Sequence, residues 1–193
     1  MRLLLVLLLF GFAGGAGAME MAGVAFAETV SVGGEDALLK GAGLRRILHF
    51  KAYLIGLYLP HRDGSLDEVL ADRGAKRLRI VAMRELEAER ISNTIDAGLH
   101  RNLSDAKFQA IAGRVELLRR AIHATARARS GAEILLDWLP GGGSGVTRLT
   151  VDGVVRGSDI PGEDFYHALI KVWPGPNVND PPLRDILLGR GGR

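Results

Sequence analysis

The 193-residue chain contains no cysteine, so no disulfide can form, and its core and hydrogen bonds must hold the fold together. Aromatic residues make up only 6% of the chain, and basic residues alternate with acidic ones to leave a formal net charge of +3. Proteins that bind nucleic acid commonly combine a basic patch with aromatic side chains that stack on bases. The composition therefore does not indicate a nucleic-acid partner.

Several catalytic signatures are also missing. Close metal-ligand spacing is not found among the five histidines, which are His49, His61, His100, His123 and His167. No Gly-x-Ser-x-Gly motif is present, so a hydrolase triad has no support. The glycine-rich segment 141–145 lacks the Lys-Ser/Thr ending of a phosphate loop, and we interpret it as a hairpin loop. We predict neither a metal site nor a cofactor.

The longest apolar run lies at the amino terminus, over residues 3–12. It is too short for a membrane-spanning helix, which needs ~20 residues, and it follows a single positive charge, as in a secretory signal peptide. Small residues predict cleavage after Ala27, with a second candidate point before Met19 and an uncleaved anchor as the alternative. We therefore predict a signal peptide over 1–27, one domain over 28–193 without a membrane span, and export to the periplasm or the medium.

The rest of the chain changes from strand-like to helical patterning and back again. Apolar residues alternate in the first and third parts, whereas the second part repeats them every four residues. Strands are predicted near residues 29–32, 37–40, 45–59, 76–84, 134–139, 146–151 and 154–155, and helices near 66–73, 87–103, 104–129, 161–173 and 181–188. This order predicts an α+β fold with a mostly antiparallel sheet.

An arginine follows a glycine-rich stretch at the start of the longest predicted strand. Gly41-Ala42-Gly43 predicts a turn, and Arg45 then opens an apolar strand. Arginine can hold a carboxylate through two parallel hydrogen bonds, although a solvated arginine at a strand start is the alternative. Tyr53 lies on the same face but ~26 Å away on an ideal strand, so both reach one ligand only if the strand bends. Otherwise Tyr53 is a tyrosine at the edge of the core.

Motifs spread over the chain resemble the chalcone isomerase-like family, and its exported bacterial branch in particular. They include Gly41-Ala42-Gly43-Leu44-Arg45, Phe50-Lys51-Ala52-Tyr53, Gly56-Leu57-Tyr58-Leu59, Leu136-Asp137-Trp138-Leu139-Pro140-Gly141 and Ile160-Pro161-Gly162-Glu163-Asp164-Phe165. The resemblance implies an open-faced β-sandwich. In that fold a large, mostly antiparallel sheet packs against a layer of helices, with a ligand cleft between them.

The same resemblance implies roles for individual residues. Arg45 matches the arginine that holds and polarises the substrate in plant chalcone isomerases. Tyr53 stands where those enzymes carry threonine, and fatty-acid-binding relatives pair the arginine with a tyrosine. The isomerases also use a tyrosine and an asparagine on a helix. The corresponding region of this chain has no tyrosine, and its polar residues of similar kind are Asn93, Thr94 and Asn102.

The resemblance therefore implies a non-catalytic domain that binds a fatty acid or a similar apolar carboxylate. Arg45 would hold the carboxylate, and the further ligand-binding candidates are Tyr53, Asn93, Thr94 and Asn102. One alternative is an isomerase of the intramolecular lyase type acting on a chalcone-like or other enone substrate, with Arg45 and Tyr53 as catalytic residues. A second alternative is a structural or partner-binding protein without a ligand. The oligomeric state is not predicted.

Overall fold

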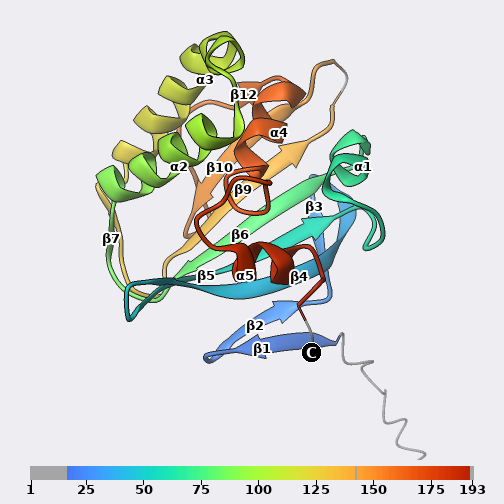
Figure 1. The fold of residues 1–193 in the computed structure, drawn as a ribbon, viewed down its shortest axis with the longest axis vertical. Coiled ribbons are helices and arrows are strands. Elements are labelled where there is room, and N and C mark those ends of the chain that lie inside the picture. The colour runs from blue at the N-terminus through green and yellow to red at the C-terminus, as the bar shows by residue number, and fades with distance from the viewer. Residues whose placement is uncertain (1–16, 142, 192–193) are drawn as a thin grey trace, which may run out of the picture.

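Helices cover one face of a curled antiparallel sheet in the computed structural model, which describes residues 17–141 and 143–191 (Figure 1). The main sheet has eight strands in the order β11-β10-β9-β6-β5-β4-β3, and β12 pairs with β10. All of its strand pairs are antiparallel. This architecture confirms the predicted α+β fold class. The apolar run over residues 3–12 lies outside the described residues.

Most of the predicted helices and strands are present, together with strands at 18–21, 24–27, 86–87, 127–128 and 160–161 that were not predicted. The strands are β1 Ala18–Met21, β2 Val24–Ala27, β3 Thr29–Val32, β4 Glu35–Ile47, β5 Phe50–Leu59, β6 Lys76–Ala82, β7 Leu86–Glu87, β8 Arg127–Ala128, β9 Glu133–Leu139, β10 Val146–Val151, β11 Val154–Val155 and β12 Ile160–Pro161. The helices are α1 Leu66–Ala71, α2 Ala88–Asn102, α3 Asp105–His123, α4 Glu163–Ile170 and α5 Pro181–Leu187. No described helix combines the length and the apolar character that a membrane span requires.

The local signals explain where α2 and α3 begin, end and pack. Ile95 and Leu99, two members of the four-residue apolar repeat, are buried against the sheet. Ser104 caps α3 by accepting a hydrogen bond from the Lys107 backbone at 3.5 Å. Gly113 lies in the interior of α3 and does not interrupt the helix. The two helices form one layer over the sheet (Figure 1).

The predicted strand over 45–59 is wrong, because the chain reverses in its middle. β4 ends at Ile47, β5 begins at Phe50, and the two strands pair as a hairpin. Leu48 makes the turn with φ of 55°, in the left-handed region. Turns of this kind normally carry glycine, asparagine or aspartate, so the apolar sequence contained no signal for the reversal.

The glycine stretch that we predicted as a turn lies inside β4, where α5 packs directly on the strand. A Cβ atom on Gly41 would lie 2.0 Å from the backbone oxygen of Ile186, and one on Gly43 would lie 2.5 Å from Cδ1 of Leu183. Two buried leucines on the inner face of α5, Leu183 and Leu187, fill this contact. The glycines therefore permit close helix–strand packing rather than a turn.

The opposite face of the sheet is partly covered by the β1–β2 hairpin. Phe26 is fully buried there, in a second apolar cluster that also contains Leu54 and Tyr58. Gly56 leaves room for its ring, since a Cβ atom at this position would lie 2.7 Å from Cδ1 of Phe26. The Arg79 guanidinium also donates a hydrogen bond to the Ala25 carbonyl at 2.7 Å. The hairpin is thus packed onto the body of the domain.

Candidate functional site: an apolar cavity between sheet and helices

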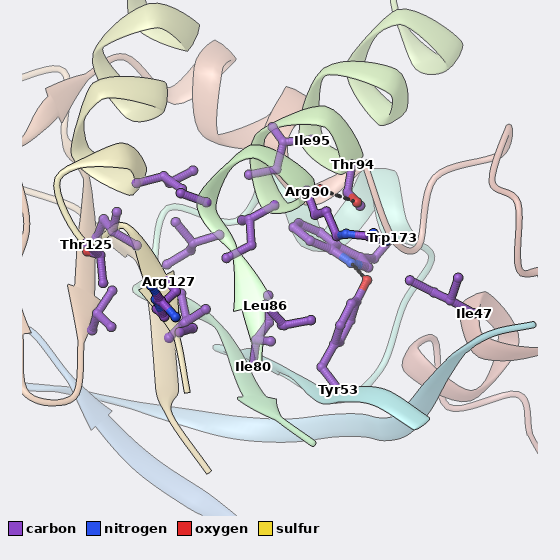
Figure 2. A pocket seen from close by; sticks show the side chains of 18 residues that line it. Ile47, Tyr53, Ile80, Leu86, Arg90, Thr94, Ile95, Thr125, Arg127 and Trp173 are labelled. Atoms are coloured by element: carbon purple, nitrogen blue, oxygen red, sulfur yellow. Dashed lines mark hydrogen bonds between the residues drawn. The ribbon is translucent and has the colours of Figure 1, made fainter. Parts of the chain in front are cut away.

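An apolar cavity opens between the helix-covered face of the sheet and the helices above it (Figure 2). Its empty volume is about 830 Å³, a figure that includes solvent space at its mouth. Most of its wall is aliphatic, contributed by Ile80, Leu86, Ile91, Ile95, Ile122, Ile134, Leu136, Leu149 and Val151. Such a wall suits a hydrocarbon ligand.

Polar side chains stand at two separate ends of this cavity. Figure 2 shows Thr125 and Arg127 at one end, on the segment that leads from α3 into β8. At the other end, Tyr53 rises from β5 towards Trp173, while Arg90 and Thr94 project from α2. A ligand with one polar group and an apolar body can therefore lie along the cavity with its polar group at either end.

Tyr53 is held in place by a buried hydrogen bond. The Trp173 indole nitrogen donates to the Tyr53 hydroxyl at 2.9 Å, and the tyrosine is only 7% exposed. Burial raises the pKa of the hydroxyl, so it keeps its proton at neutral pH. None of the described residues accepts a hydrogen bond from this hydroxyl. Its proton is therefore available to an oxygen atom of a ligand.

Arg45 lies directly beside Tyr53, because the hairpin makes the two residues cross-strand partners. Such partners have Cα atoms ~4.5–5.5 Å apart, in place of the ~26 Å expected on a single strand. Arg45 does not line the large cavity but a smaller neighbouring pocket, and Tyr53, Thr94 and Trp173 border both. The two spaces thus meet at the Tyr53–Trp173 pair.

The Arg45 guanidinium is already paired with a carboxylate of this chain. Its Nη1 atom lies 2.6 Å from Oδ2 of Asp180, and both side chains are about three-quarters buried, with exposed fractions of 21% and 26%. The other carboxylate oxygen of Asp180 accepts from the Leu183 backbone at 3.2 Å and caps α5. The arginine is therefore built to hold a carboxylate, and in this structure the carboxylate is Asp180.

The helical candidates lie in three different surroundings. Thr94 borders both pockets, and its hydroxyl donates to the Arg90 carbonyl at 2.9 Å. Asn93 is exposed and lines neither pocket. Asn102 lies away from both as well, and its amide oxygen accepts from the Asn177 backbone at 3.1 Å. Asn102 thereby tethers the segment that carries Asp180.

Two residues of this site were not predicted as site residues. Trp173 is the last residue of the helix predicted over 161–173, and Asp180 directly precedes the helix predicted over 181–188. The sequence did not reveal either pairing, because Trp173 is 120 residues from Tyr53 and Asp180 is 135 residues from Arg45. The available signal was an arginine beside a mostly apolar segment, because a largely buried charge normally needs an opposite charge next to it.

Comparisons with known proteins agree with this architecture. A family model described as chalcone isomerase-like matches residues 18–189. The crystal structure of a fatty-acid binding protein from Arabidopsis thaliana is similar, with a TM-score of 0.67 and 12% sequence identity, over 91% of this chain and 97% of that one. At this identity the likeness shows a shared fold. No curated protein matches the chain. The extent of the family match shows that the chain belongs to the chalcone isomerase-like family.

Proposed function

We propose that this domain binds a fatty acid or a similar apolar carboxylate in the cavity between sheet and helices, without catalysis. The observation that carries the proposal is the cavity itself, whose aliphatic wall ends at a protonated tyrosine. The fatty-acid binding protein with the same fold supports the same ligand class. Burial of methylene groups contributes about 0.8 kcal/mol each, so an acyl tail can supply most of the affinity.

We place the carboxylate at the end of the cavity where Tyr53 and Trp173 stand. The Tyr53 hydroxyl can donate to one carboxylate oxygen, and Arg45 lies behind it in the adjoining pocket. This binding mode takes its hydrogen bond from Tyr53, whereas the isomerase alternative needs Arg45 itself to stabilise an anionic oxygen, and Arg45 is paired with Asp180. An arginine that is already paired with a carboxylate stabilises the negative charge that develops on an enone oxygen less well than an unpaired arginine.

Replacing Asp180 by asparagine is expected to raise the affinity for a long-chain fatty acid roughly tenfold. Asparagine caps a helix about as well as aspartate, so α5 keeps its N-cap while Arg45 loses its competing anion. Tenfold corresponds to ~1.4 kcal/mol, a reasonable size for removing one negative charge near the ligand carboxylate in a largely buried site. The measurement is isothermal titration calorimetry with delipidated protein.

The fatty alcohol of the same chain length is the matched control ligand, since it fills the cavity but carries no charge. Its affinity is expected to be equal in the wild type and in Asp180→Asn. In Arg45→Ala the preference for acid over alcohol should disappear. An unchanged fatty-acid affinity in Asp180→Asn contradicts a head group at the Tyr53–Trp173 end and favours the other end of the cavity, near Arg127.

We also propose that the chain is exported, and that it belongs to the exported bacterial branch of the family. The packing of β2 favours cleavage before Met19 over cleavage after Ala27. Cleavage after Ala27 would remove the fully buried Phe26. Cleavage before Met19 keeps that residue. Amino-terminal sequencing of protein isolated from its own host is expected to give Met19, and a start at Glu28 would show that the domain is stable without β2.

A further inference from the structure

The turn of the β4–β5 hairpin exposes three large apolar side chains in four consecutive positions. Leu48 is 86% exposed, and Phe50 and Ile47 are 48% and 45% exposed. Leu48 also adopts a left-handed conformation that is unfavourable for leucine. In Figure 1 the turn stands at the end of the sheet, next to the connection between β6 and β7. An exposed, strained leucine adds nothing to the packing of the domain itself.

Basic side chains surround this apolar tip. Arg46, His49 and Lys51 belong to the turn, and no acidic residue occurs between Asp36 and Asp63. From the neighbouring connection, the Arg84 guanidinium lies 5.0 Å from the centre of the Phe50 ring. Glu85, the acidic residue nearest to Arg84 in the sequence, is paired with Arg127 at 3.3 Å. The tip therefore combines exposed apolar side chains with neighbouring basic side chains.

We propose that this hairpin tip docks on the surface of an anionic lipid bilayer. Apolar side chains that insert at the acyl boundary, flanked by basic side chains that reach the head groups, are the chemistry of interfacial membrane binding. Leu48 and Phe50 supply the insertion, and Arg46, Lys51 and Arg84 supply the contact with anionic head groups. A protein partner would instead need acidic groups around an apolar socket, and self-association through the tip is an outcome of the test.

The tip also lies at the mouth of the apolar cavity. Ile47 belongs both to the exposed tip and to the cavity wall. Across the opening, Arg90 lines the cavity with a side chain that is 75% exposed. Docking through the tip therefore brings the cavity mouth against the bilayer, where an apolar ligand can exchange without crossing water. This exchange step rests on the proposed function, whereas docking does not.

The test is co-sedimentation of the protein, purified from its own host, with vesicles of phosphatidylglycerol and phosphatidylcholine in equal parts. The wild type is expected to bind these vesicles, to bind phosphatidylcholine vesicles at least tenfold more weakly, and to be released by salt. Leu48→Gly should lower the partition coefficient at least tenfold while its thermal midpoint does not fall, because glycine suits a φ of 55°. The matched control is Leu117→Ala, which removes an exposed leucine from α3 and should bind like the wild type.

Vesicle binding by Leu48→Gly at the wild-type level overturns the inference, as does a wild type that binds no vesicles. The inference is also overturned if the tip binds a second copy of this chain. That result would appear as a wild-type dimer that becomes a monomer in Leu48→Gly. Binding of a soluble fatty acid is measured in parallel without vesicles, where Leu48→Gly should equal the wild type. Fatty-acid binding without docking refutes only the inference, and docking without fatty-acid binding refutes only the proposed function.

Discussion

Replacing Ile91 by tryptophan is expected to lower the affinity for a long-chain fatty acid about 50-fold. Ile91 lies on α2, lines the cavity and is only partly buried, so an indole there can extend into empty space without displacing the core. If the ring excludes about three methylene groups of the ligand, the loss is ~2.4 kcal/mol at ~0.8 kcal/mol each. At 1.4 kcal/mol per tenfold change, this corresponds to a factor of ~50 in Kd.

The matched control for this substitution is Leu117→Trp. Leu117 is an exposed leucine on the neighbouring helix α3 and does not line the cavity. Its variant should bind fatty acid like the wild type, and both variants should unfold within a few degrees of it. A fatty-acid affinity that is unchanged in Ile91→Trp would mean that the ligand does not occupy this cavity.

Gly41→Ala is expected to destabilise the domain by about 3 kcal/mol, the largest stability effect that we predict for one added methyl group. The new Cβ would lie 2.0 Å from the Ile186 backbone oxygen, so strand and helix must separate. Full loss of the α5 contact would expose Leu183 and Leu187, and each buried leucine contributes ~1.5–3 kcal/mol. We expect α5 to move only partly, so the loss of stability stays below the value for full exposure of both leucines.

Urea unfolding of Gly41→Ala beside Gly113→Ala measures this effect. Gly113 lies in the interior of α3, and a Cβ there would have no heavy atom within 4 Å. Its variant should be more stable than the wild type by ~0.5–1 kcal/mol, because alanine favours the helix. Equal stability of Gly41→Ala and the wild type would show that α5 does not pack on β4 as described.

The fold was predictable wherever local chemistry and chain order coincide. Ser65 and Glu68 form the capping box that their spacing indicates, with hydrogen bonds of 2.6 and 3.3 Å that start α1. Asp152 and Gly153 both have positive φ, as their type I′ signal requires, and they connect β10 to β11. In these cases a few neighbouring residues determine the structure.

The candidate site was predictable only in part, because its geometry depends on a turn without a turn signal. Arg45 and Tyr53 were predicted to share one face, as they do, but their adjacency follows from the reversal at Leu48. Their partners Asp180 and Trp173 come from segments that the tertiary fold brings back to β4 and β5. Long-range pairing of this kind leaves no periodicity in the sequence.

The most direct test of the proposed function is native mass spectrometry of protein purified from its own host. We expect the wild type to carry a fatty acid or a similar apolar carboxylate as an additional mass, and Ile91→Trp to lose most of it while Leu117→Trp retains it. A wild-type protein that carries no ligand, and that binds no long-chain fatty acid when one is added, would contradict the proposed function.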